Sequence, residues 1–101
     1  MGEVLARLGA HPQQYFFWAT HSGAELDLLV VRGARRFGFE FKHSAAPRLT
    51  ASMRVALRDL KLERLDVVYV GNETFPLSHN VRALGLSRVL SDLAPLSIHD
   101  A

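Results

Sequence analysis

The spacing of hydrophobic positions changes several times along the chain, and each spacing predicts one kind of element. From Met1 to Gly9 apolar residues recur at helical spacing, and from Tyr15 to Thr20 an aromatic run predicts a first strand. The apolar run at 26–31 and the alternating run at 36–42 predict two more strands, joined by a polar turn at Gly33. The first part of the chain is therefore expected to form a helix followed by three strands.

The second part begins with apolar residues three and four apart, which predict an amphipathic helix over 48–61. The nearly continuous apolar run at 65–70 is typical of a central strand that is covered on both faces. A helix between the hairpin and this strand gives the order αβββαβ, an α/β (α+β) fold class with a mixed central sheet flanked by helices. Weaker signals predict an edge strand at 74–77 with Pro76 in it, a strand at 81–86 and a helix at 88–93 that Ser87 caps.

Acidic side chains gather on the two strands of the predicted hairpin. Because side chains alternate along a strand, Glu25 and Asp27 are expected to share one face, and Glu40 and Lys42 share a face of the next strand. Neighbouring carboxylates repel one another, which raises the pKa of at least one of them, and a divalent cation relieves that repulsion. Asp27, Glu40 and the main-chain carbonyl of Phe41 are a hard-ligand set suited to Mg²⁺ or Mn²⁺.

The order of Asp27, a hairpin turn and then Glu40, Phe41 and Lys42 resembles the D…E-x-K signature of the PD-(D/E)XK nuclease superfamily. The longer run at 23–44, together with the aromatic residues 15–18 before it, is similar to the C-terminal DUF4143 domain found behind AAA+ ATPase modules. This resemblance implies a restriction-endonuclease-like fold. It also implies that the chain is the C-terminal fragment of a longer ATPase.

The resemblance also implies roles for individual residues. Asp27 and Glu40 would bind the metal, Lys42 would position the attacking water, and Glu25 would tune the metal or bind a second ion. Glu3, on the first helix, stands about where related families carry a further glutamate that faces the metal. If the domain is active, it is a Mg²⁺-dependent phosphodiesterase or endonuclease that acts on DNA.

Composition limits these expectations without changing them. A chain of 101 residues with 49% hydrophobic and 22% charged residues is one globular domain over 1–101. It has no cysteine and no apolar run near the length that spans a bilayer, so we expect a cytoplasmic protein with no membrane partner. The net charge of +2 allows DNA as a partner without requiring it. An oligomer, or a complex with the upstream ATPase domain, is compatible with all of this.

Two other functions stay open at this stage. In one, the polar cluster is structural and the domain is an inactive nuclease-fold module that serves partner recognition or assembly. In the other, the helical stripe of Arg54, Arg58 and Lys61 binds nucleic acid without a metal. The aromatic residues of the first strand could stack on bases, but packing in the core is the expectation that we carry forward.

Overall fold

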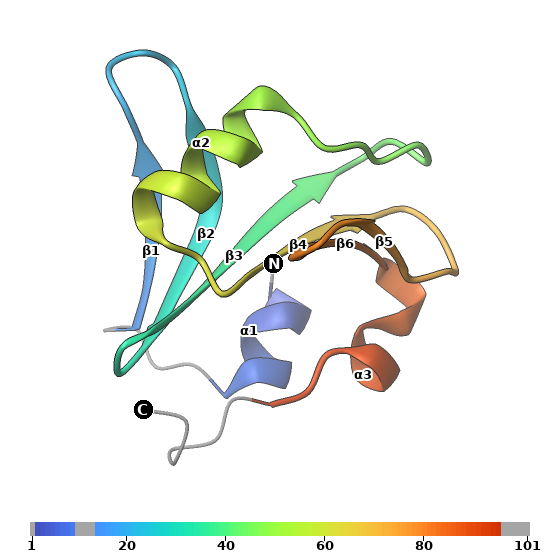
Figure 1. The fold of residues 1–101 in the computed structure, drawn as a ribbon. Coiled ribbons are helices and arrows are strands. Elements are labelled where there is room, and N and C mark those ends of the chain that lie inside the picture. The colour runs from blue at the N-terminus through green and yellow to red at the C-terminus, as the bar shows by residue number, and fades with distance from the viewer. Residues whose placement is uncertain (1, 10–13, 96–101) are drawn as a thin grey trace.

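The computed structural model describes residues 2–9 and 14–95, and its elements follow the predicted order (Figure 1). Met1, which the sequence placed in the first helix, lies outside the described residues. The first elements are α1 (Gly2–Leu8), β1 (Tyr15–Ala19), β2 (Glu25–Arg32), β3 (Arg35–Lys42) and α2 (Ala51–Leu60). They are followed by β4 (Arg64–Tyr69), β5 (Phe75–Ser78), β6 (Val81–Gly85), the 3-10 turn η2 (Leu86–Arg88) and α3 (Val89–Asp92).

The strands form one mixed sheet, which in the described part of the chain has the order β1-β2-β3-β4-β6-β5. Strands β1, β2 and β3 are successive antiparallel neighbours, whereas β3 pairs with β4 in parallel, and β4 with β6 in parallel. The parallel step from β3 to β4 needs a crossover, and α2 supplies it. The predicted α+β class with a mixed sheet flanked by helices is therefore confirmed.

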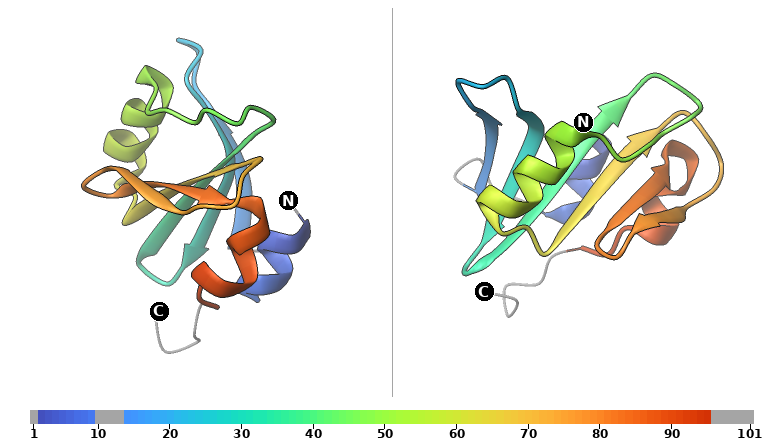
Figure 2. Two further views of the ribbon diagram at one scale, coloured as in Figure 1. Left: turned by 90° about the vertical axis from the view of Figure 1, so that its right-hand side faces the viewer. Right: turned by 45° about the horizontal axis from the view of Figure 1, so that its top comes forward.

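Helices cover both faces of the sheet (Figures 1 and 2). On the face of α1 and α3, Phe37 and Phe39 of β3 are buried in one hydrophobic core. On the face of α2, a second core surrounds Gly38. A Cβ atom at Gly38 would lie 2.7 Å from the Cδ1 atoms of Leu62 and Leu65, so the two leucines occupy the space that a larger residue would need.

Helix α2 begins at Ala51, three residues later than predicted, because Thr50 caps it. The Thr50 hydroxyl accepts a hydrogen bond from the amide of Met53 at 3.2 Å, and Thr50 itself has extended backbone angles. The helix ends at Leu60, and the C-cap residue Lys61 has a left-handed φ of 51°. No helix within residues 2–9 and 14–95 is long and apolar enough to cross a membrane.

Two expectations from the sequence are wrong in detail. Phe16 and Phe17 do not pack in the core, because β1 is an edge strand and leaves them 48% and 67% exposed. Ser87 does not cap the last helix, because its hydroxyl contacts the carbonyl of Gly71 and the side chain of Asn72 instead. The helix α3 is also shorter than predicted, because Arg88 belongs to η2 and the helix ends one residue early, at Asp92.

Candidate functional site

A bulge in β2 sets the position of Asp27. Phe16 pairs with Leu29 and Trp18 pairs with Leu26, so β2 contributes one more residue than β1 between these two pairs. The extra residue breaks the alternation of β2. Leu26 is buried in the core on the α2 face, whereas Leu28 is buried in the core on the opposite face. Asp27 lies between them, at the point where the strand changes phase.

The carboxylate of Asp27 accepts a hydrogen bond from β3 where the main-chain pairing of β2 with β3 has ended. The described pairs between β2 and β3 end at Leu28 and Phe39. Beyond this end, the amide of Phe41 donates a hydrogen bond to Oδ2 of Asp27 at 2.9 Å. In an extended strand the N–H and C=O groups of one residue point to the same side, so the carbonyl of Phe41 is also directed toward Asp27.

Glu40 lies beside this contact and is only 8% exposed. Burial is the largest cause that raises its pKa, from the ordinary 4.5 to about 7. Repulsion by the carboxylate of Asp27 and a hydrogen bond with it raise the pKa further, while the charge of Lys42 opposes the shift. The side chains of Asp27 and Glu40 therefore lie close together, and a pKa of about 7 leaves Glu40 about half protonated near neutral pH.

Lys42, the last residue of β3, is exposed and lies between two small cavities. A cavity of about 180 Å³ is lined by Lys42 together with Glu3, Phe41, His43, Val68, Tyr69, Val70 and Leu86. Another, of about 240 Å³, is lined by Lys42, Ser44, Ala46, Pro47, Arg48 and Thr50. Asp27 and Glu40 are not among the residues that line these two cavities, and Lys42 acts on Glu40 through its charge. Arg48 is the second cationic residue in the wall of the larger cavity.

Glu25 differs from Asp27 and Glu40 in its exposure and in its main-chain contacts. Its side chain is exposed, and its main chain is tied to α2 because the amide of Glu25 donates to Oγ of Ser52 at 2.8 Å. Ser52 donates in turn to the carbonyl of Glu25 at 3.1 Å. Within the described residues, the charged groups that act on Glu40 are Asp27 and Lys42, and Glu25 is not among them. Glu3 is exposed on α1 and reaches this end of the sheet through the cavity that it shares with Lys42.

The donor set suits some cations and not others. No group of three or more His, Cys, Asp or Glu side chains that could hold a metal is present in the described part of the chain. Mg²⁺ is commonly held by one or two carboxylates and otherwise keeps its waters, so Asp27, Glu40 and the carbonyl of Phe41 fit it. They do not fit a closed tetrahedral zinc site, which takes Cys and His ligands. The metal-binding and catalytic roles of these residues stay predictions.

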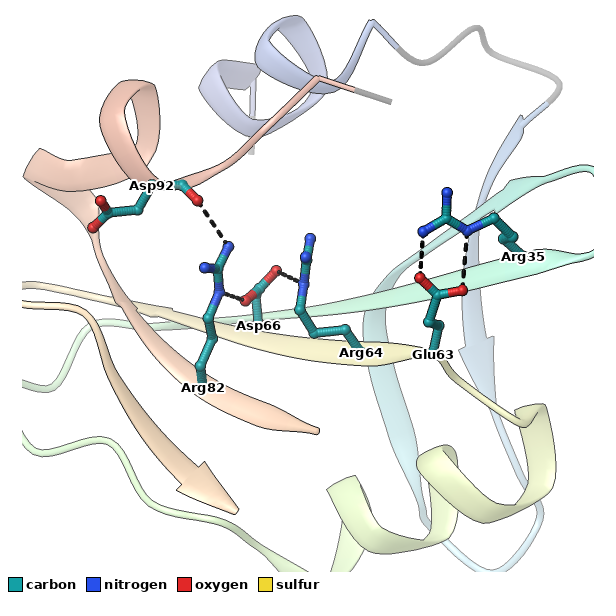
Figure 3. Close-up of polar contacts among 6 residues, drawn as sticks. All are labelled: Arg35, Glu63, Arg64, Asp66, Arg82 and Asp92. Atoms are coloured by element: carbon teal, nitrogen blue, oxygen red, sulfur yellow. Dashed lines mark hydrogen bonds and ion pairs between the residues drawn. The ribbon is translucent and has the colours of Figure 1, made fainter. Parts of the chain in front are cut away.

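Sequence reasoning missed a second polar cluster, centred on Asp66 of β4 (Figure 3). Asp66 is fully buried, and its two oxygens accept hydrogen bonds from Nε of Arg64, at 2.9 Å, and from Nε of Arg82. Arg82 also donates to the main-chain carbonyl of Asp92 at 3.2 Å. The available signal was a lone acid within the apolar run at 65–70, with an arginine two residues before it on the same face of the strand.

Comparison with known proteins places the chain in a family. The model of "Domain of unknown function (DUF4143)" matches residues 1–89. Two uncharacterized proteins, one from Mycobacterium bovis and one from Mycobacterium tuberculosis, are each 44% identical to the chain over 92 residues, or 89% of its length. The match covers 21% of each relative, so the chain spans about a fifth of their length. No solved structure gave a significant match. The predicted resemblance to DUF4143 is thereby confirmed, and the chain belongs to the DUF4143 family.

Proposed function

We propose that this domain is a nuclease-fold module of the PD-(D/E)XK type that binds Mg²⁺ or Mn²⁺ and hydrolyses DNA phosphodiesters. The observation that carries the proposal is the pair of half-buried Asp27 on β2 and buried Glu40 on β3, which lie close together with the pKa of Glu40 raised to about 7. Asp27 has a structural partner in the amide of Phe41, but placing Glu40 next to it costs stability because neighbouring carboxylates repel each other. Strongly shifted acids gather instead at sites that bind cations or transfer protons.

Each residue of the site has a distinct part in this proposal. Asp27 and Glu40 supply carboxylate oxygens, and the carbonyl of Phe41 supplies a neutral one. A bound Mg²⁺ would add positive charge near the phosphate and lower the pKa of a water molecule. Lys42 would hold the attacking water or donate to a phosphate oxygen, where the transition state gains negative charge. Hydrolysis adds this water to phosphorus and breaks one phosphorus–oxygen bond of the backbone.

The cavity wall beside Lys42 supports a phosphate as the substrate group. Lys42 and Arg48 line the cavity of about 240 Å³ together with the hydroxyl residues Ser44 and Thr50. Two cations and two hydroxyl groups can bind a phosphodiester without reading its sequence. The net charge of +2 offers few further phosphate contacts, so we propose that binding to a duplex also uses the rest of the longer protein, including an ATPase module.

Calorimetric titration with Mg²⁺ and with Mn²⁺ tests the metal site. Wild type should bind, and Asp27→Asn should not. Asparagine is the appropriate substitution because its side-chain oxygen can still accept from the amide of Phe41, so lost binding would not reflect an unpaired strand. Glu25→Gln is the matched control and should bind like wild type. A silent titration on folded wild type would contradict the proposal.

Plasmid nicking in Mn²⁺ tests the chemistry. We expect Lys42→Met to lower the rate by about a hundredfold, the usual effect of removing one donor from a transition state. The control is Lys61→Met, which removes the same charge at the C-terminal cap of α2. Since Glu63, just after this cap, bonds to Arg36 near the start of β3, Lys61 lies at the opposite end of β3 from Lys42. Equal nicking by wild type and Lys42→Met would exclude Lys42 from the reaction.

A specific observation also favours the inactive module as a second candidate. Asp27 already has a structural partner in the amide of Phe41, and the described residues lack a third acid in reach. A domain of this kind would use the fold for partner recognition or assembly. It would bind no metal, and Asp27→Asn would change only its stability.

A further inference from the structure

The two edges of the sheet differ in how well they are protected from pairing with another chain. At one edge, β5 contains Pro76, which has no N–H group to donate, and its register with β6 shifts between Pro76 and Ser78. At the other edge, β1 has the sequence YFFWA, with no charge and no proline. Charged side chains and prolines are the usual means by which proteins block an exposed edge. Strand β1 has neither.

The hydrogen-bonding groups of β1 that point away from β2 can be assigned. The amide of Thr20 donates to the carbonyl of Ala24 at 2.9 Å, so the main-chain groups of Thr20 point toward β2. Alternation along the strand then turns the groups of Phe16 and Trp18 toward β2 as well. In the described part of the chain β1 pairs with β2 alone. The N–H and C=O groups that point outward are those of Tyr15, Phe17 and Ala19.

We propose that β1 pairs with β1 of a second copy of this chain, in antiparallel orientation, and joins the two sheets into one across a two-fold axis. The strand carries no charge, so two copies can pair without electrostatic repulsion. For the same reason the strand offers nothing that would attract a partner rich in one charge. A head-to-tail contact of β1 with β5 is disfavoured by Pro76. Pairing of β1 with itself is an isologous contact, which closes after two copies.

The outward groups also select a register. If the two-fold axis passes through Phe17, then Phe17 lies opposite its own copy, and Tyr15 lies opposite Ala19 of that copy. All the outward N–H and C=O groups are then used in hydrogen-bonded pairs. Phe16 lies opposite Trp18 of the other copy, which places two large aromatic rings across the junction. Exposure supports this contact, because 67% of Phe17 and 48% of Phe16 are accessible in the single chain.

Sedimentation equilibrium over a concentration series tests the association. Wild type should approach twice the monomer mass, and Phe17→Lys should remain a monomer because it places two ammonium groups face to face. Leu90→Lys is the matched control. It makes the same kind of change at a residue that is 74% exposed on α3, away from β1, and it should dimerise like wild type. Wild type that stays monomeric throughout the series would overturn the proposal, as would equal dimerisation by Phe17→Lys.

Disulfide trapping tests the register, and the absence of cysteine from the chain leaves no background. Residues opposite each other in a hydrogen-bonded antiparallel pair have Cα atoms about 5.5 Å apart, within the range of a disulfide. Phe17→Cys should therefore form a covalent dimer rapidly under mild oxidation. Phe16→Cys places its thiol diagonally from its copy and should react several times more slowly. Equal rates for the two variants, or no covalent dimer with Phe17→Cys, would contradict the centred register.

Discussion

Two acids are buried in the same sheet, and their surroundings are opposite. Asp66 is fully buried between the guanidinium groups of Arg64 and Arg82, so both of its oxygens are paired with positive charge (Figure 3). Glu40 is almost as buried, but the charged group that affects it most is another carboxylate, that of Asp27. Burial and this repulsion raise the pKa of Glu40 to about 7.

The difference separates a structural acid from a candidate functional one. A buried charge is tolerated when opposite charges and hydrogen bonds compensate it, as they do at Asp66. The charge of Glu40 is compensated only in part, by Lys42 and by a hydrogen bond with the backbone of Asp27, and the cost of burying it falls when the side chain takes up a proton. Burial alone would not distinguish the two residues, since both lie on central strands of the sheet. The sign of the neighbouring charge distinguishes them.

The largest expected effect is that of Asp66→Asn. The amide of asparagine presents N–H donors to groups that are themselves donors, and it leaves Arg64 and Arg82 without their counter-charge. We expect the free energy of unfolding to fall by about 3 kcal/mol, the usual cost of removing one partner of a buried ion pair. Urea denaturation of the variant and of wild type measures this difference. A loss below about 1 kcal/mol, the scale of a surface pair, would mean that the cluster is not structurally important.

The matched substitution Glu40→Gln should have the opposite sign. The pKa of Glu40 is higher in the folded protein than in the unfolded chain, so the folded protein loses stability as the pH rises from the ordinary pKa of 4.5 to about 7. Glutamine removes this loss, so at pH values above 7 the variant should be more stable than wild type by about 2–3 kcal/mol. Below the ordinary pKa of 4.5 the two proteins should be similar in stability.

Unfolding of wild type and Glu40→Gln at a series of pH values checks this prediction. Glu25→Gln is the control, since Glu25 is exposed on the same strand as Asp27 and should leave the pH dependence unchanged. If Glu40→Gln destabilised the protein as much as Asp66→Asn, the distinction between the two acids would be lost.

Metal binding at the site should depend on pH in the same range. Mg²⁺ competes with the proton on Glu40, whose pKa is about 7. The apparent association constant should therefore rise about tenfold from about pH 6 to about pH 8. Calorimetry at both values, in two buffers of different ionisation enthalpy, would also count the proton released. Affinity that is independent of pH would show that Glu40 is not a ligand.

The smallest expected effect is at the exposed pair of Arg35 and Glu63. Nε of Arg35 donates to Oε1 of Glu63 at 3.0 Å, and a second contact joins the same two side chains. Both are partly exposed, so a double-mutant cycle should give a coupling of about 0.5 kcal/mol. A coupling as large as the effect of Asp66→Asn would mean that burial is not what separates the strong pairs from the weak ones.

Much of the fold and the centre of the site could be predicted from the sequence. Period-two alternation identified the hairpin, and the hairpin turn brings Asp27 to Glu40 as expected. The helical spacing at 48–61 identified the crossover helix, although its start at Ala51 depends on the cap at Thr50. These features depend on residues close together in sequence, which is why local patterns predict them.

The features that the sequence did not reveal depend on contacts between distant segments. The bulge in β2 appears only in the pairing with β1, so no local pattern could reveal it. The exposure of Phe17 follows from the place of β1 at the edge of the sheet, which no local pattern encodes. The partners of Asp66 likewise come partly from Arg82, on a strand that is adjacent only in the folded chain.

The most direct test of the account is the pKa of Glu40 measured by carboxyl ¹³C NMR titration, in wild type and in Asp27→Asn. We predict a value of about 7 in wild type, and a lower one in the variant because the repulsion by Asp27 is gone. Saturating Mg²⁺ should lower the wild-type value as well. A wild-type pKa near the ordinary 4.5, unchanged by Asp27→Asn and by Mg²⁺, would contradict the claim that these two acids form a cation site.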